Sequence, residues 1–194
     1  MKRLLITGFE PFGGENINPS WEAVTKLPDE INEYELTKLR LPVEFSNAAQ
    51  MVIDCADSIC PDVIICVGQA GGRSAITPEL VAINLRNALI PDNSGYKPQD
   101  EPIIIGGSTA YFSTLPVRKI AEAINEKGII ANVSYSAGAY VCNDLIYTLL
   151  AHFENTSTRA GFIHVPYATI QNKVPSIELD DITKALIVAI ENLD

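Results

Sequence analysis

The feature that most constrains the fold is a continuous run of apolar residues, Val63-Ile64-Ile65-Cys66-Val67, which ends at Gly68. A strand with one face in water alternates polar and apolar residues, whereas an unbroken apolar run is typical of a central parallel strand covered on both faces. The run therefore predicts an α/β protein, with an open, mostly parallel, twisted sheet and helices on both faces.

Strand-like and helix-like segments alternate along the rest of the chain. Strands are predicted at residues 4–7, 35–42, 129–134 and 161–165, with a short strand-like stretch at 80–84. Helices are predicted at 18–27, 46–57, 117–127 and 143–153, and a final helix is capped by Asp180 or Asp181. The length of 194 residues fits a single domain, residues 1–194. The irregular segment 74–101 is long for a connection, and we interpret it as a functional loop or a hairpin excursion.

Composition excludes several classes of function. A net charge of −10 without any basic run argues against a nucleic-acid partner. No segment reaches the roughly eighteen apolar residues of a membrane span, and the apolar amino terminus is too short for an export signal. Four cysteines without paired spacing favour a reduced, cytoplasmic setting, although a Cys55–Cys60 disulfide stays open. Two histidines without neighbouring cysteine pairs argue against a metal site, and we expect no cofactor.

In open α/β sheets the ligand site lies beyond the carboxyl ends of the strands. One of the loops expected there, after Ser134, leads to Cys142 at the start of a predicted helix. The N–H groups and dipole of a helix N-terminus favour thiolate over thiol, so we expect the pKa of Cys142 to be lowered. The alternative interpretation is an unreactive cysteine of the core.

A reactive cysteine needs a base, and the chain has two histidines. His152 lies ten residues beyond Cys142 along one helix, about 15 Å at 1.5 Å per residue, too far for a hydrogen bond. His164 follows a predicted strand at the correct edge, so a Cys142–His164 pair is the hypothesis for covalent catalysis. Glu79 and Asp92 are the carboxylate candidates for orienting the imidazole, and a solvated loop acid is the alternative for each.

Seven motifs occur in collinear order along the chain: Gly8-Phe9-Glu10-Pro11-Phe12-Gly13-Gly14 with Asn18-Pro19-Ser20; Gly68-Gln69-Ala70-Gly71-Gly72-Arg73; Ile76-Thr77-Pro78-Glu79; Ile90-Pro91-Asp92-Asn93; Tyr111-Phe112-Ser113-Thr114-Leu115-Pro116; Ala137-Gly138 with Val141-Cys142-Asn143; and Gly161-Phe162-Ile163-His164-Val165-Pro166-Tyr167. Together they resemble the pyroglutamyl peptidase I (pyrrolidone-carboxylate peptidase) family of cysteine peptidases.

The resemblance implies removal of an amino-terminal pyroglutamyl residue from peptides through a thioester. It implies Cys142 as nucleophile, His164 as general base and then acid, and Glu79 as the orienting carboxylate. It also implies a cytosolic homotetramer or homodimer that uses no metal.

Pyroglutamate is a small neutral lactam, so its pocket should be apolar with a few groups that match an amide. We expect Phe9, Phe12, Tyr140 and Val141 to enclose the ring, and Asn18 and Gln69 to bind the lactam C=O and N–H. The predicted substrate-binding set also includes Asp92. Core packing is the alternative role for the two phenylalanines.

Two positions depart from the family pattern. Leu89 stands where the family commonly has an arginine associated with the oxyanion, and Leu80 replaces the arginine that usually follows Glu79. Losing one oxyanion donor costs roughly a hundredfold to a thousandfold in rate, unless Arg86 reaches the same place. Two other hypotheses therefore stay open: a pyroglutamyl-peptide-binding relative with little turnover, and an amidase for another small acyl or cyclic amide.

Overall fold

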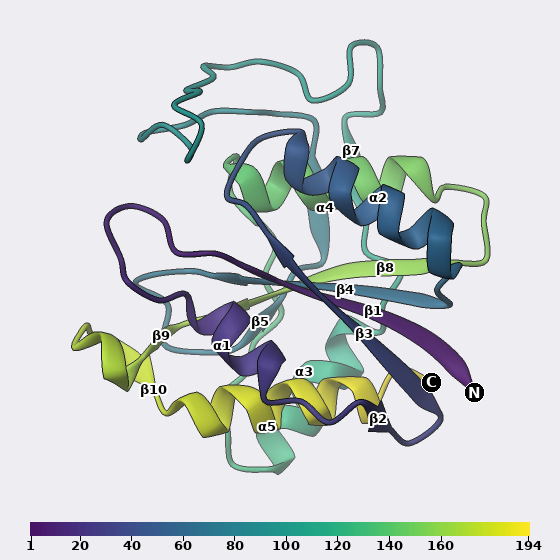
Figure 1. The fold of residues 1–194 in the computed structure, drawn as a ribbon, viewed down its shortest axis with the longest axis vertical. Coiled ribbons are helices and arrows are strands. Elements are labelled where there is room, and N and C mark those ends of the chain that lie inside the picture. The colour runs from purple at the N-terminus through teal and green to yellow at the C-terminus, as the bar shows by residue number, and fades with distance from the viewer.

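The computed structural model describes residues 1–194 and is built on a six-stranded sheet with the order β2-β3-β1-β4-β8-β5 (Figure 1). Its strands are β1 (Lys2–Phe9), β2 (Glu30–Ile31), β3 (Tyr34–Leu41), β4 (Val63–Gln69), β5 (Thr77–Pro78) and β8 (Arg159–Val165). The four long strands are parallel, and the short β2 and β5 pair antiparallel at the two edges. The predicted mostly parallel α/β sheet is confirmed, with the apolar run 63–67 in the middle as β4.

Helices cover both faces of this sheet (Figure 1). On one face lie α1 (Pro19–Thr25), α3 (Val117–Glu126) and α5 (Leu179–Glu191), and on the other lie α2 (Asn47–Ile59) and α4 (Val141–His152). Alternate residues of β4 enter opposite cores, because successive side chains of a strand point to opposite faces. Val63 and Ile65 pack with the first group of helices, and Ile64 and Cys66 with the second.

Two smaller sheets lie outside the main one: β6 (Val81–Ile83) pairs with β7 (Ala110–Phe112), and β9 (Tyr167–Ala168) pairs with β10 (Ser176–Ile177). Residues 84–109 leave between β6 and β7 as the long loop above α2 and α4 in Figure 1. Arg86 and Glu101 exchange two backbone hydrogen bonds at 2.7 and 3.0 Å across its base. The irregular segment is thus a hairpin-like excursion, which was one of its two expected forms.

The predicted strand at 129–134 is wrong. The segment runs beside residues 76–79 but forms only two isolated bridges, Ile76 with Ala131 and Glu79 with Ser134. Pro78 lies between these bridges and has no N–H to donate, so a continuous ladder does not form.

The predicted cap of the last helix is also wrong. Glu178 is the N-cap residue of α5 and makes no side-chain capping bond, while Asp180 and Asp181 lie within the first turn. Their charges there stabilise the helix through its dipole instead of capping it.

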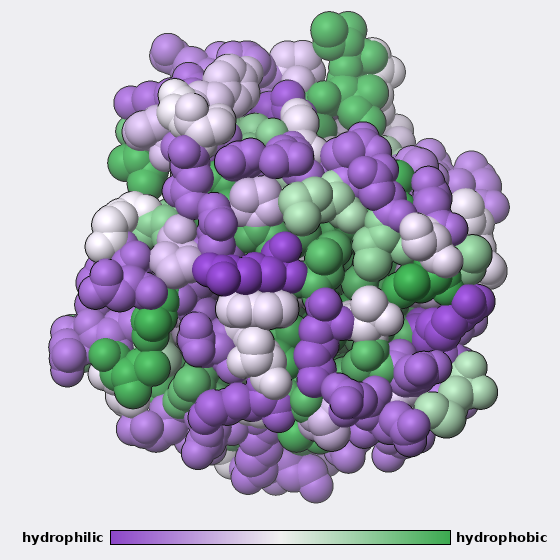
Figure 2. All heavy atoms as spheres, viewed as in Figure 1, coloured by the Kyte–Doolittle hydropathy of each residue, from purple (hydrophilic) through white to green (hydrophobic).

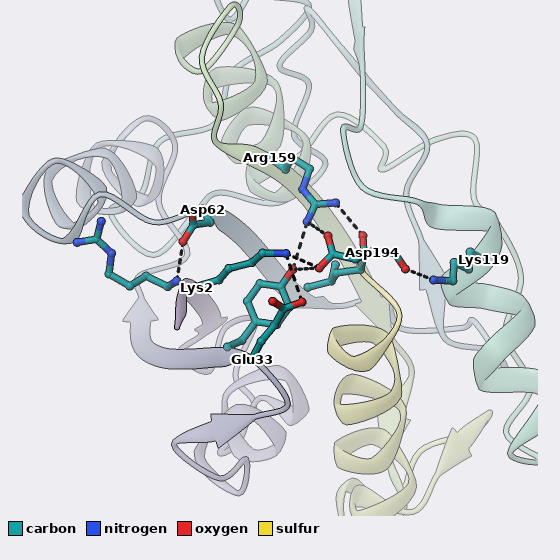
Figure 3. Close-up of polar contacts among 9 residues, drawn as sticks. Lys2, Glu33, Asp62, Lys119, Arg159 and Asp194 are labelled. Carbon is teal, nitrogen blue, oxygen red and sulfur yellow. Dashed lines mark hydrogen bonds and ion pairs between the residues drawn. The ribbon is translucent and has the colours of Figure 1, made fainter.

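A cluster of charged side chains joins the two ends of the chain (Figure 3). The Asp194 carboxylate accepts bonds from Lys2 Nζ at 2.7 Å, Arg159 Nη2 at 2.8 Å and the Tyr34 hydroxyl at 2.9 Å. These contacts connect the chain end after α5 to β1, β3 and β8.

On the face of the molecule that Figure 2 shows, hydrophobic residues form separate groups among hydrophilic ones. No helix combines the length and apolar character needed to span a membrane.

Candidate active site

Cys142 is the second residue of α4, whose N-cap is Tyr140. Tyr140 has extended backbone and supplies no side-chain cap, and the Asp144 N–H is the first to bond within the turn, to the Tyr140 carbonyl at 3.1 Å. The N–H groups at the start of a helix have no intrahelical acceptor. Those of Val141, Cys142 and Asn143 are therefore available to a negative charge beside the thiol.

The two residues after Cys142 anchor this helix end. The Asn143 amide is fully buried, accepts from the Ile83 N–H at 3.0 Å and donates to the carbonyls of Ile83 and Leu85, both at 2.9 Å. The buried Asp144 carboxylate pairs with Arg86 Nε at 2.5 Å and accepts from the Ser46 N–H at 2.7 Å. The position of the thiol is therefore set by β6 and by the loop that follows it.

His164 lies near the carboxyl end of β8, paired in register with Gly68 of β4. The Cys142 sulfur packs over that glycine: a Cβ built on Gly68 would lie 3.0 Å from Sγ and 2.7 Å from the Phe162 ring. Cys142 and His164 line one cavity together with Arg73 and Ser136. The absence of a side chain at position 68 makes room for the thiol beside the imidazole.

Glu79 directly follows β5, the edge strand that pairs with β8, and its side chain reaches His164. Its Oε1 lies 2.7 Å from His164 Nδ1, and both side chains are almost fully buried. Arg73 Nη1 contacts the same oxygen at 2.6 Å, while Glu79 Oε2 is buried without a hydrogen-bond partner. Because a carboxylate only accepts, the proton of the neutral imidazole is on Nδ1 and Nε2 is left as the base.

Burial dominates the titration of this group. Burial, assisted by the charge of Glu79, raises the pKa of Cys142 to about 12, against the opposing effects of Arg73 and the thiol's own backbone N–H. Burial also lowers the pKa of His164 below its ordinary value, although Glu79 opposes this. Burial raises the pKa of Glu79, but the neighbouring His164 imidazole, Ser134 hydroxyl and Arg73 guanidinium outweigh it and leave that pKa below its ordinary value.

The resting site is therefore a neutral thiol, a neutral imidazole and a carboxylate. The expected lowering of the Cys142 pKa by the helix N-terminus is outweighed by burial.

Cys142 also lines a second cavity. This cavity is small, with a volume of about 40 Å³, and is lined by Phe9, Phe12, Asn18, Val43, Gln69, Tyr140, Val141 and Cys142. Six of the seven residues predicted to bind the substrate therefore line this one cavity. Val43 was missed because it follows a strand and carries no chemical signal. Of the two phenylalanines for which core packing was the alternative, Phe9 is 2% exposed and belongs to the core, whereas Phe12 is only partly buried against it.

The two amides of this cavity are partly engaged. Asn18 caps α1, accepting from the Ser20 N–H at 3.1 Å and its hydroxyl at 2.8 Å, and donates one N–H to the Glu10 carbonyl at 3.0 Å. Gln69 accepts from Gln171 Nε2 at 2.9 Å. One N–H of Asn18 and both of Gln69 remain, so these side chains mainly offer donors.

Asp92 does not line this cavity or the one beside His164. Its carboxylate accepts from the N–H groups of Phe45, Ser94 and Tyr96 and from the Ser94 hydroxyl, at 2.7 to 3.0 Å. Burial raises its pKa, but these bonds outweigh burial and the net shift is downward. Asp92 organises the loop of residues 84–109, and Glu79 is the carboxylate that reaches His164.

Neither Leu89 nor Arg86 lines a cavity that contains Cys142. Leu89 is 90% exposed and lines an apolar pocket that shares Phe12 and Tyr140 with the second cavity. Arg86 is turned to Asp144 and the Ser46 hydroxyl, so it does not reach the place expected for it. No group of three or more His, Cys, Asp or Glu side chains is arranged to hold a metal ion.

Comparison with known proteins supports the resemblance over the whole chain. A family model described as pyroglutamyl peptidase matches residues 2–194. The pyrrolidone-carboxylate peptidase of Thermococcus kodakarensis is 48% identical over 194 residues, covering 97% of this chain and 94% of that protein. The Bacillus subtilis pyrrolidone-carboxylate peptidase is also 48% identical, covering 97% and 90%.

Solved structures agree with these relatives. The crystal structure of pyroglutamyl peptidase I from Bacillus amyloliquefaciens is similar to this chain with a TM-score of 0.95 at 46% identity, covering 100% of this chain and 97% of that one. The Thermococcus litoralis pyrrolidone carboxyl peptidase has a TM-score of 0.95 at 38% identity, covering 100% and 93%. The chain belongs to the pyroglutamyl peptidase family.

Proposed function

We propose that this protein is a cysteine peptidase that hydrolyses the bond after an amino-terminal pyroglutamyl residue of peptides. The observation that carries the proposal is the meeting of Cys142, His164 and Glu79 at one edge of the sheet, beside a mostly apolar cavity. Membership of the pyroglutamyl peptidase family over residues 2–194 supports the same activity.

In the first step His164 Nε2 takes the proton of the Cys142 thiol as sulfur attacks the pyroglutamyl carbonyl carbon. The carbonyl oxygen becomes an oxyanion that accepts from the free N–H groups at the start of α4. Glu79 stabilises the imidazolium through Nδ1, at 2.7 Å in the resting site. When the C–N bond breaks, the imidazolium gives its proton to the departing amine and a thioester remains.

In the second step His164 takes a proton from water, and the resulting hydroxide equivalent attacks the thioester carbonyl. The C–S bond breaks, the imidazolium returns the proton to sulfur, and free pyroglutamate leaves. The neutral resting pair is regenerated, so each turnover consumes one water and no other reactant.

The lactam ring is assigned to the second cavity, which Cys142 lines and Arg73 does not. Phe9, Phe12, Tyr140 and Val141 offer apolar walls, and the remaining N–H groups of Asn18 and Gln69 match the lactam carbonyl. An ordinary amino-terminal residue would place a charged ammonium there without a counter-charge among the lining residues. This explains why the ring, which has no free amine, is selected.

Hydrolysis of a pyroglutamyl fluorogenic amide tests the proposal. Cys142→Ala and Cys142→Ser should each lose activity, while Cys60→Ala, at an exposed cysteine, should keep it. Activity that survives both changes at position 142 would contradict the mechanism.

The second candidate is a relative that binds pyroglutamyl peptides with little turnover, which the sequence left open because leucine replaces the family's arginine at position 89. Calorimetry separates the two, because a binder holds the peptide intact whereas an enzyme releases pyroglutamate. An amidase for another small acyl amide keeps the same nucleophile, and a panel of acyl amides identifies it.

The family resemblance and four unpaired cysteines support a cytoplasmic location, and the resemblance supports a single domain that assembles as a homotetramer or homodimer. Exposed apolar side chains such as Ile105 and Phe112 are compatible with contacts between copies. Light scattering coupled to size-exclusion chromatography measures the assembly directly.

A further inference from the structure

Arg73 contacts the proposed catalytic group without being part of it. It lies in the loop that follows β4, four residues after Gln69, and its side chain is 29% exposed. Nη1 donates to Glu79 Oε1 and to the Thr77 hydroxyl, both at 2.6 Å, and Nη2 donates to the Ser136 carbonyl at 2.9 Å. One guanidinium thus joins the Glu79 carboxylate to the segment that leads into α4.

Arg73 is the charged neighbour of Glu79. The Glu79 side chain is 1% exposed and Oε2 has no partner, while its other polar neighbours, His164 and the Ser134 hydroxyl, are neutral in the resting site. A buried carboxylate with no positive neighbour takes up a proton, because burial disfavours the charged form. Arg73 is the permanently charged group within bonding distance, since a guanidinium keeps its proton in proteins.

The protonation of Glu79 decides which nitrogen of His164 carries the proton. An ionised Glu79 only accepts, which requires N–H at Nδ1 and leaves Nε2 free to take the thiol proton. A protonated Glu79 would donate to Nδ1 instead, and the imidazole proton would move to Nε2. That tautomer has no lone pair facing the thiol and is inactive as a base.

Through Nη2, Arg73 also contacts Ser136, which lines the cavity that contains Cys142 and His164. Ser136, Gly138, Cys142, His164 and Arg73 all line it. Residues 134–136 are also held by a hydrogen bond that the Leu80 N–H donates to the Ser134 carbonyl at 2.8 Å. The bond from Nη2 to Ser136 therefore fixes the path of the chain just before the nucleophile.

We propose that Arg73 is a positioning residue of this site, which keeps Glu79 ionised and oriented so that His164 holds the tautomer able to accept the Cys142 proton. The inference rests on the proposed function for its kinetic consequences, but its structural consequence, the tautomer of His164, is independent of turnover.

The test compares Arg73→Gln and Arg73→Lys with the control Arg118→Gln, at an exposed arginine whose contact is the Tyr135 hydroxyl. The first measurement is the ¹⁵N spectrum of the imidazoles, in which His152→Gln assigns the two histidines. His164 should carry its proton on Nδ1 in wild type and in Arg118→Gln, and should shift toward Nε2 in Arg73→Gln.

The second measurement is the pH profile of kcat/KM with a pyroglutamyl amide whose leaving group is uncharged. Loss of the orienting carboxylate's charge should cost about 100-fold or more in kcat, as in comparable triads. The acid limb should move to higher pH, because Arg73 lowers the pKa of both Glu79 and His164. KM should change little. Arg73→Lys keeps the positive charge but reaches only one of the two groups, Glu79 and the Ser136 carbonyl. It should therefore leave the pH of the acid limb unchanged and lose less activity than Arg73→Gln.

An unchanged tautomer together with an unchanged acid limb in Arg73→Gln would overturn the inference. A loss confined to KM that follows the charge of the leaving peptide would also overturn it, because Arg73 would then bind substrate directly. If Arg73→Gln does not fold, Arg73→Met takes its place with the same two measurements. If wild type shows no hydrolysis, the proposed function fails, and the tautomer measurement still decides the role of Arg73.

Discussion

Gly68 lies beneath the two side chains that are proposed to react. A Cβ there would lie 3.0 Å from Cys142 Sγ and 2.7 Å from the Phe162 ring, distances that side chains do not tolerate without a shift. Gly68→Ala should therefore displace the thiol and lower kcat at least tenfold while the protein stays folded. Activity assays with circular dichroism check this, and a variant with wild-type kcat would contradict the packing described for Cys142.

The exposed position of Leu89 predicts a smaller effect on kcat than the loss of an arginine at this sequence position suggested. Its side chain is 90% exposed and outside the cavities that contain Cys142, and the oxyanion is assigned to the N–H groups of α4. Leu89→Arg should change kcat less than about threefold, well below the effect of an oxyanion donor. A rise of a hundredfold in steady-state assays would show that the loop of residues 84–109 closes over the substrate.

At the residue level, the expected meeting of Cys142, His164 and Glu79 followed from their places at strand and helix ends in family order. Arg73 lies in one of the seven motifs, but the sequence alone assigns it no role. Its bond to Glu79 depends on how two loops approach each other in the folded chain. A helix N-terminus indicated a lowered Cys142 pKa, whereas the depth of burial, which decides the sign, is a tertiary property.

At the scale of elements, α4 carries Cys142, the proposed nucleophile, and its first turn is anchored by Asp144. This carboxylate is fully buried and paired with Arg86, which is 15% exposed. Removing one partner of a buried pair leaves the other charge uncompensated, at a cost of about 3 kcal/mol or more. Asp144→Asn should lower the free energy of unfolding by that amount in urea titrations.

The matched control is Asp29→Asn, which breaks the pair of Asp29 with Lys38, since Asp29 is 92% exposed. Such a surface pair contributes about 1 kcal/mol or less. Equal effects of the two substitutions would contradict the anchoring assigned to Asp144.

Elements with a clear apolar period were predictable, as β4 and α3 show. The segment 129–134 has strand-like composition but faces Pro78, and no local pattern reports the neighbour with which a strand must pair. The caps of α5 differed for a related reason: two aspartates inside the first turn satisfy the helix dipole as well as a cap would.

At the scale of the molecule, several buried or paired groups have shifted titration. The pKa of Glu79 and that of Asp92 are lowered in the folded state despite burial, and the pKa of Asp194 is lowered chiefly by its bonds to Lys2 and Tyr34. Carboxylates of this kind stabilise the fold above their unfolded pKa, about 4, and lose that contribution as the pH falls. Burial lowers the pKa of His164, so its cost begins below about pH 6.5.

The urea midpoint should therefore decrease from pH 7 to pH 5.5 and decrease more steeply toward pH 4. Asp92→Asn should flatten the steep part, because its carboxylate no longer titrates. A midpoint that rises on acidification would mean that relief of the net charge of −10 outweighs these groups.

The central claim is that Cys142 carries the pyroglutamyl group during turnover. An activated pyroglutamyl ester should acylate the enzyme faster than water removes the group, so acid quenching in the first turnover should trap the thioester. Mass spectrometry of the digested protein should then find the pyroglutamyl group on the peptide that contains Cys142, and none on the same peptide from Cys142→Ala. Continued hydrolysis by Cys142→Ala, with no modified Cys142 in wild type, would contradict the account.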